Sequence, residues 1–158
     1  MSTVISGSEI AVGLGKQFEG SILNTHDNFI LVESQKIQEI CSHLKKSPKF
    51  NCVLLNAITA VDYVEFFELI YQMTSIVDNK TCVIKTRVFG REEPSVPSVV
   101  SVWKGADLQE REVFDLMGIS FIGHPDLRRI LLWEGFQGYP LRRDYLEPPL
   151  PYSWPHGG

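Results

Sequence analysis

Charged side chains are concentrated between Trp103 and Tyr145, and they are the residues of this chain whose types could best take part in a reaction. Glu134, Asp144 and the carboxylates of residues 106–117 are of the type that performs acid–base catalysis. The sequence places no nucleophile with a base and no phosphate-binding loop beside them. Dense charges and aromatics without such chemistry indicate a surface that holds one shape against a protein partner.

His124 and the three cysteines are the candidate metal ligands of this chain. No cysteine, glutamate or second histidine stands at ligand spacing from His124, so a structural hydrogen bond is favoured over metal binding. Cys41, Cys52 and Cys82 are widely spaced and form no CxxC pair. We therefore expect buried, reduced thiols and neither a zinc site nor a disulfide framework.

A charged helix over residues 106–117 is expected to position the acidic groups, with Gly118 ending it. Asp107, Arg111 and Asp115 recur every four residues along it, so Arg111 can pair with a carboxylate on each side. The simpler interpretation of this spacing is an exposed ladder of charges.

Glu110 differs from these residues because a helical wheel places it within the apolar arc of the same helix. A buried carboxylate without a partner costs several kcal/mol, so it must be neutralised or paired. We expect a bidentate contact from one of the nearby arginines. The candidate arginines are Arg128, Arg129, Arg142 and Arg143.

The first ninety residues predict an α+β fold, with helices packed on a mainly antiparallel sheet. Ser8 and Ser34 are expected to cap two helices, over residues 8–18 and 34–46. Strands are expected over 28–32, over 52–61 as a central strand covered on both faces, and over 82–89. Residues 64–76 fit either period, and the turn-like residues after them favour a hairpin.

Composition and length limit the function further. The chain has 158 residues and a formal charge of −4, which is typical of one globular domain and unlike a nucleic-acid-binding protein. No signal sequence and no run of 18 apolar residues is present, so any membrane association is expected to be indirect. We expect a single α+β domain over 1–145, in which the charged helix follows the sheet, and an extended proline-rich C-terminal segment over 146–158.

The charged segment and the residues before it resemble one known family. The matching motifs are Val-Pro-Ser-Val-Val-Ser-Val-Trp at 96–103, Glu-Arg-Glu at 110–112, Gly-His-Pro-Asp-Leu-Arg-Arg-Ile-Leu at 123–131 and Pro-Leu-Arg-Arg-Asp-Tyr at 140–145. They are similar to the thirty-kilodalton subunit of respiratory complex I, which is the C-type subunit of bacterial NADH–quinone oxidoreductase and the J-type subunit of the plastid enzyme. The likeness is almost continuous over 96–145 and looser over 28–90.

The resemblance implies a peripheral-arm subunit that is inactive alone and docks the quinone-site (forty-nine-kilodalton type) subunit. It implies that Fe-S clusters, flavin and quinone belong to other subunits, which carry electrons from NADH to quinone with proton translocation. It also implies a peripheral position on the cytoplasmic face of the cell membrane, or the equivalent face of an organelle membrane. The residues expected to form the subunit interface and its charge network are Glu110, Arg111, Asp115, His124, Arg128, Arg129, Arg142, Arg143 and Tyr145.

Some positions depart from the family pattern, notably Trp133, Tyr139 and Glu134-Gly135-Phe136. These departures leave the branch of the family open. The alternative function is the equivalent subunit of a related complex that uses ferredoxin, reduced deazaflavin or hydrogen as donor, as in energy-converting hydrogenases. A free-standing hydrolase would instead require activity from the chain alone.

Overall fold

The computed structural model describes residues 2–146 and consists of one main sheet with helices and a second, two-stranded sheet. The main sheet has the order β2-β3-β6-β5-β4, and β1 also pairs with β6. Its hairpin β4–β5–β6 and the pair β2–β3 are antiparallel, whereas β1 and β3 run parallel to β6. The strands are β1 (Thr3–Val4), β2 (Ile22–Thr25), β3 (Ile30–Val32), β4 (Leu54–Asp62), β5 (Phe66–Ser75) and β6 (Lys80–Phe89).

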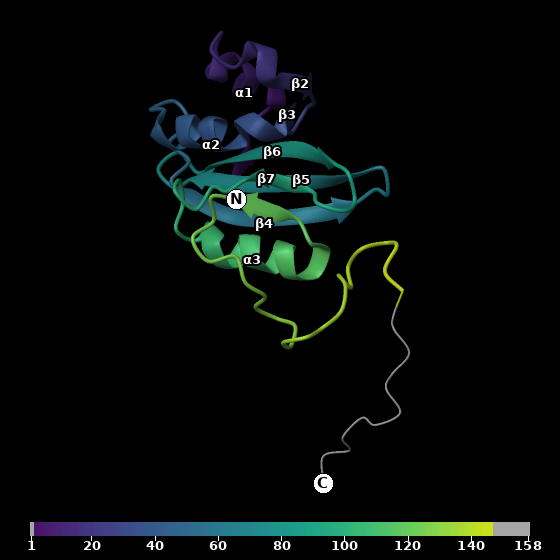
Figure 1. The fold of residues 1–158 in the computed structure, drawn as a ribbon. Coiled ribbons are helices and arrows are strands. Elements are labelled where there is room, and N and C mark those ends of the chain that lie inside the picture. Colours follow the sequence, from purple (N-terminus) through teal and green to yellow (C-terminus); the bar gives the residue numbers. More distant parts are fainter. Residues whose placement is uncertain (1, 147–158) are drawn as a thin grey trace.

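In the part of the chain that the structure describes, three α-helices complete the fold, with short 3-10 turns at Glu19–Ser21 and Ser34–Lys36. Figure 1 shows the short strand β7 between α2 and α3. The remaining elements are α1 (Gly7–Leu14), α2 (Ile37–Lys46), α3 (Ala106–Met117), β7 (Ser95–Pro97) and β8 (Ser120–Ile122). The predicted α+β class with a mainly antiparallel sheet is confirmed.

One face of the main sheet forms the core, because alternate residues of its central strands are buried. Phe67, Leu69, Tyr71 and Met73 of β5 are all fully buried. On β6 the alternate residues Cys82, Ile84, Thr86 and Val88 are buried, and Thr81 near the start of the strand is buried as well. The opposite face carries Glu68, which accepts hydrogen bonds from Lys85 at 3.0 Å and Arg87 at 3.3 Å.

The two N-terminal helices bury the faces that their periodicity predicts. Ile10 and Leu14 of α1 and the four apolar positions of α2 are buried. The N-cap of α1 is Ser6, whose hydroxyl accepts from the N–H of Glu9, so the prediction of Ser8 as the cap was wrong by two residues. Ser34 begins a 3-10 turn, and the α-helix itself starts at Ile37.

The hairpin prediction for residues 64–89 is confirmed, but the prediction of a central strand at 52–61 was wrong. That segment forms β4 from Leu54, at the edge of the main sheet, and Leu54 is 44% exposed. Its apolar residues on both alternations arise because α3 packs against it as well as the core. β2 was not predicted, since its four residues include no clear alternation.

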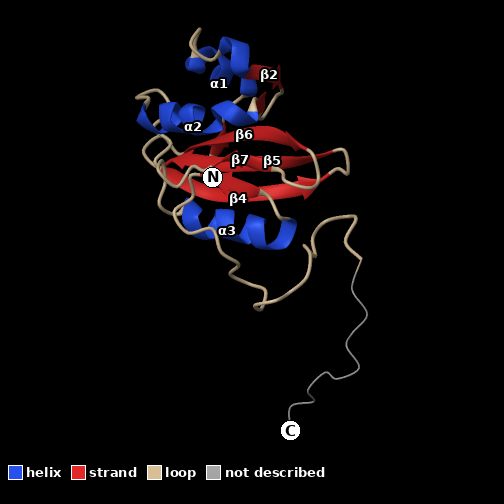
Figure 2. Ribbon diagram, viewed as in Figure 1, coloured by secondary structure: helices blue, strands red, loops and turns tan. Residues whose placement is uncertain are grey.

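Helix α3 occupies the predicted residues and ends at Gly118, whose left-handed φ of 70° matches its expected role. After β8 the chain continues as turns and loops to residue 146 (Figure 2). The predicted proline-rich segment 146–158 lies outside the described residues except for Leu146. Among residues 2–146, no helix combines the length and apolar character needed to cross a bilayer.

Candidate functional site

Glu110 is fully buried on α3 and binds the turn that follows β7. The hydroxyl of Ser98 donates to one carboxylate oxygen at 2.6 Å, and the N–H of Val99 donates to the other at 2.7 Å. Burial raises the pKa of Glu110 above its usual value, although both hydrogen bonds oppose this shift. The predicted arginine partner was wrong, because the adjacent turn supplies two neutral donors.

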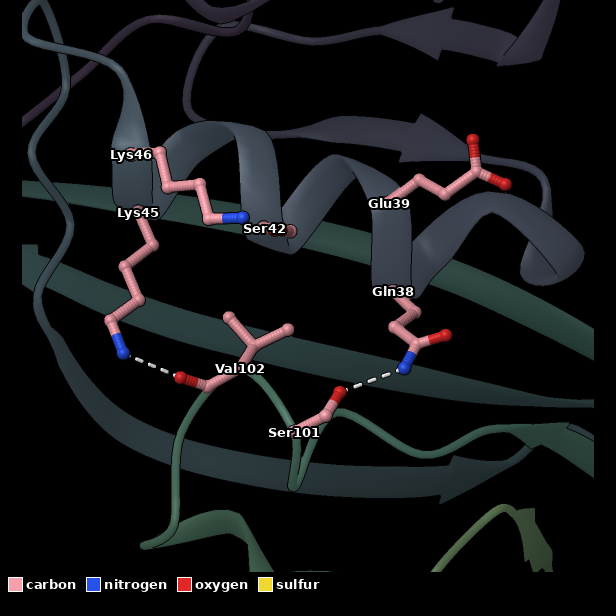
Figure 3. Close-up of a pocket in the computed structure, with 7 residues that line it drawn as sticks. All are labelled: Gln38, Glu39, Ser42, Lys45, Lys46, Ser101 and Val102. Atoms are coloured by element: carbon pink, nitrogen blue, oxygen red, sulfur yellow. Dashed lines mark hydrogen bonds between the residues drawn. The ribbon is translucent and has the colours of Figure 1, made fainter.

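The turn that holds Glu110 is itself fixed to α2. Figure 3 shows Lys45 and Gln38 reaching from this helix across a surface hollow to the turn. Lys45 donates to the carbonyl of Val102 at 2.5 Å, and Gln38 donates to the hydroxyl of Ser101 at 2.8 Å. These two hydrogen bonds span the hollow and fix the turn to α2. They thereby position Ser98 and Val99, the donors to Glu110.

Asp115 is the second buried carboxylate of α3, and it organises the chain after β8. One oxygen accepts three backbone N–H groups, from Ile130 at 3.0 Å, Leu131 at 2.7 Å and Leu132 at 2.9 Å. The other accepts from Arg129 at 3.1 Å. Burial opposes the charge of Asp115, but these four donors outweigh it and lower the pKa. The ionised carboxylate therefore fixes residues 129–132 against the helix.

The other arginines of this region bind backbone carbonyls or an exposed acid. Arg111 donates to the carbonyls of Arg128 and Arg129 at 3.1 and 3.4 Å. Within residues 2–146 it forms no ion pair with a carboxylate of its own helix, so the predicted charge ladder was wrong. Arg128 forms a bidentate pair with Asp126, at 2.6 and 2.7 Å, and this pair is exposed.

His124 has the structural role that the sequence favoured. Its Nδ1 accepts the N–H of Asp126 at 3.0 Å, which places the ring proton on Nε2. Nε2 then donates to the carbonyl of Asp107 at 3.2 Å. The side chain is fully buried, so His124 joins the turn before residue 126 to the first turn of α3.

Arg142 caps the opposite end of α3. Its guanidinium donates to the carbonyl of Met117 at 2.6 Å, to that of Gly118 at 3.3 Å and to that of Arg91 at 2.6 Å. It also lies over the rings of Phe67 and Tyr139. A cation here is favourable because the helix dipole leaves its C-terminal carbonyls negative. Arg142 was one of the arginines expected to pair with Glu110, but its hydrogen-bond partners here are carbonyls.

An ion-pair cluster that the sequence did not reveal ties residues 143 and 144 to the main sheet. Arg91 binds both Asp62 and Asp144, and Asp62 also accepts the backbone N–H of Arg143 at 2.9 Å. The side chain of Arg143 is exposed, and Tyr145 stacks on Phe136. The partners of Arg91 are 29 and 53 residues away, a separation that leaves no local pattern.

These contacts together create an anchored segment, which we define as residues 129–146. Its backbone is held by the carboxylates and guanidinium groups described above, while several apolar side chains face outward. The exposed ones are Ile130, Leu131, Trp133, Leu141 and Leu146. A rigid backbone that presents apolar side chains is suited to binding another protein. Among residues 2–146 there is no group of three metal-ligating side chains.

Comparison with known proteins identifies relatives of this chain. The family described as the respiratory-chain NADH dehydrogenase 30 Kd subunit matches residues 30–149. A C-type subunit of NADH-quinone oxidoreductase from Rhizobium etli is 42% identical over 117 residues, which cover 72% of this chain and 62% of the relative. The corresponding subunit of Parvibaculum lavamentivorans is 42% identical over 134 residues, covering 80% of this chain and 66% of the relative. The chain thus spans a little under two thirds of the length of these relatives.

A solved structure shares the fold. A chain of the membrane-bound sulfane sulfur reductase, an archaeal respiratory membrane complex, superposes with a TM-score of 0.68 at 24% identity. The alignment covers 88% of this chain and 85% of that one. The family match extends over most of this chain and includes α3 and the whole of the anchored segment. The chain therefore belongs to the family of the 30-kilodalton subunit of respiratory-chain NADH dehydrogenase.

Proposed function

We propose that this chain is a non-catalytic peripheral-arm subunit of a membrane-associated NADH–quinone oxidoreductase. Its task is to dock the quinone-site subunit so that the assembled complex passes electrons from NADH to quinone with proton translocation. The names of the relatives support NADH and quinone as the substrates of the complex over the alternative donors ferredoxin, reduced deazaflavin and hydrogen. The flavin, the Fe-S clusters and the quinone belong to other subunits.

The observation that carries this proposal is the anchored segment. Its residues Leu131, Trp133 and Leu141 are 61%, 60% and 57% exposed, yet the backbone around them is fixed by buried or partly buried charged groups. Ordering this segment before binding reduces the entropy lost on association. The exposed side chains then form the apolar centre of the interface, and the exposed Arg128 and Arg143 lie where they can pair with acidic groups of the partner.

The proposed location follows from the same assembly. The subunit lies on the cytoplasmic face of the cell membrane, or the equivalent organelle face, and its membrane association is indirect through the partner. This arrangement requires no lipid contact from the residues of the anchored segment.

Co-purification from detergent-solubilised membranes tests the proposal. The tagged full chain is compared with a Leu131→Gln/Leu141→Gln variant, which keeps both backbone N–H groups while removing apolar surface. The matched control is Val77→Gln, an 81% exposed apolar residue in the β5–β6 turn, far in sequence from the anchored segment. We expect the double variant to recover at least tenfold less quinone-site subunit, with the control unchanged. Equal recovery of that subunit by all three chains would overturn the proposal.

A further inference from the structure

Two of the three cysteines lie in direct contact, although they are 30 residues apart. The sulfur atoms of Cys52 and Cys82 are 3.3 Å from each other. Cys82 belongs to β6 and faces the core, whereas Cys52 lies in the short connection between α2 and β4. All three thiols are free and buried.

The contact places the two sulfur atoms close enough for one to attack the other once that one has been oxidised. The hydrogen bond between Cys52 and Cys82 holds the pKa of Cys52 below its usual value, although burial opposes this effect. The pKa of Cys82 is raised by the same contact and by burial. A disulfide forms when a thiolate attacks an oxidised sulfur within reach, and this arrangement supplies both partners.

Access to Cys52 requires the opening of only a short surface connection. Asn51 before it is partly exposed and adopts a left-handed φ of 45°, and Val53 after it is 41% exposed. Two hydrogen bonds of Cys52 help to hold the connection. Its N–H donates to the carbonyl of Leu44 at 3.1 Å, and its own carbonyl accepts from Nε1 of Trp103 at 3.2 Å. Local opening of this kind leaves the strands of the main sheet intact.

We propose that Cys52 and Cys82 form a hydroperoxide-oxidisable dithiol site that closes to a disulfide. The Cys52 thiolate attacks the terminal oxygen of a hydroperoxide, so that an S–O bond forms and the O–O bond breaks. The hydroxide or alkoxide that leaves takes up a proton and becomes water or an alcohol. The Cys82 thiol then attacks the sulfenic sulfur, so that the S–S bond forms and the sulfenic oxygen leaves as water with the thiol proton of Cys82. Overall, two thiols lose two electrons and two protons, and the peroxide is reduced.

The disulfide ties the connection after α2 to β6. Trp103, which follows the turn that binds Glu110, donates to the backbone carbonyl of Cys52. The oxidation state of the two cysteines is therefore coupled to the position of this turn. A small thiol reductant restores the pair, because thiol–disulfide exchange reverses the step.

Thiol mapping of the full chain tests the proposal, both purified and in membranes. The protein is treated with hydrogen peroxide, unfolded with an alkylating reagent present, digested and analysed by mass spectrometry. We expect the two alkylated thiols of Cys52 and Cys82 to disappear together and a peptide joining them to appear. Dithiothreitol should restore both, while Cys41, which shares no hydrogen bond with another thiol within residues 2–146, should stay alkylated throughout.

Variants make the outcome specific. Cys41→Ser should form the linked peptide as the unmodified chain does, whereas Cys82→Ser should not, and its Cys52 should accumulate as the sulfenic or sulfinic acid. Retention of all three thiols in the peroxide-treated unmodified chain would overturn the proposal, as would a linked peptide that contains Cys41. The measurement on the unmodified chain decides the matter even if Cys82→Ser does not fold.

Discussion

Arg91 binds Asp62 through two parallel hydrogen bonds, with Nη1 2.8 Å from one carboxylate oxygen and Nη2 2.7 Å from the other. The same guanidinium binds both oxygens of Asp144 at 2.8 Å. Asp62 is only 3% exposed and ends β4, whereas Asp144 lies near the end of the anchored segment. One arginine therefore connects the edge of the main sheet to the proposed interface.

Removing Arg91 should leave the buried carboxylate of Asp62 without its ion-pair partner. We expect Arg91→Ala to lower the free energy of unfolding by about 3 kcal/mol, since a buried carboxylate that loses its partner is strongly destabilising. Arg128→Ala is the matched control, because Arg128 forms the same bidentate contact with an exposed carboxylate. Urea unfolding of both variants checks this, and equal stability of the two would contradict it.

Acid should weaken the hold of α3 on the anchored segment. The pKa values of Asp62 and Asp115 are lowered in the folded protein, the first by Arg91 and the second by three N–H groups and Arg129 against burial. A lowered pKa means that the unfolded state takes up protons first as the pH falls. The stability from both groups is therefore complete above their ordinary pKa of 3.8 and is lost progressively below it.

Asp115→Asn isolates this effect. We expect it to cost about 2 kcal/mol at neutral pH, because three N–H groups and Arg129 lose a charged acceptor. The difference from the unmodified chain should shrink as the pH falls below about 4. Thermal melts from pH 7 to pH 3 measure it, and a difference that stays constant over this range would disprove the assignment.

Gly118 should tolerate no side chain. Its φ is 70°, and a Cβ there would lie 2.4 Å from an atom of Tyr139 and 2.6 Å from Arg142. We expect Gly118→Ala to destabilise the protein by about 2 kcal/mol, from strain and from displacement of the cap of α3. Gly105→Ala, at the other end of the helix, meets no atom within 4 Å and has an ordinary φ of −65°. Its melting temperature should be unchanged or slightly higher.

Much of the fold was predictable because local periodicity determines it. The buried positions of α2, the alternation of β6 and the limits of α3 all follow from spacing and from end signals such as Gly118. β4 was misplaced because a helix covering an edge strand produces the same two-sided apolar pattern as a central position. The short β2 has too few residues for a period to be visible.

The buried position of Glu110 could be predicted from the sequence, whereas the pairings of the candidate site could not. Glu110 was correctly identified as buried, and its amphipathic position is a local property of the helix. Its partners Ser98 and Val99 depend on how the turn after β7 packs, which the arginine-rich sequence nearby does not reveal. Arg91 was missed for the same reason. Composition identifies which charges need partners, whereas tertiary packing decides which donors reach them.

Arg142 and Arg143 are adjacent but should have different roles. Arg142→Ala leaves the carbonyls of Met117, Gly118 and Arg91 without their charged donor, so we expect a loss of about 2 kcal/mol in stability. The side chain of Arg143 is exposed, and within the described residues 2–146 it forms no hydrogen bond or ion pair. Arg143→Ala should therefore keep the melting temperature while reducing recovery of the partner from membranes. A drop in melting temperature for Arg143→Ala would show that it acts within the fold instead.

Glu110 should respond to pH in the opposite sense from Asp115. Burial raises its pKa in the folded protein, so the folded state retains a proton that the unfolded state releases above its ordinary pKa of 4.5. The unmodified chain therefore loses stability from this group as the pH rises through that value. Glu110→Gln abolishes this titration while keeping a side-chain oxygen for the N–H of Val99.

We accordingly expect the melting temperature of Glu110→Gln, relative to the unmodified chain, to rise between pH 4 and pH 7. The relative melting temperature of Asp115→Asn should instead fall between pH 3 and about pH 4 and stay level above that. Both carboxylates lie on α3, so the two variants can be compared directly. Opposite changes of relative melting temperature with pH would distinguish Glu110, which neutral donors bind in the core, from Asp115, which a guanidinium and three N–H groups hold. A parallel decline for both variants would mean that Glu110 is ionised and stabilised at neutral pH, as the arginine pairing expected from the sequence requires.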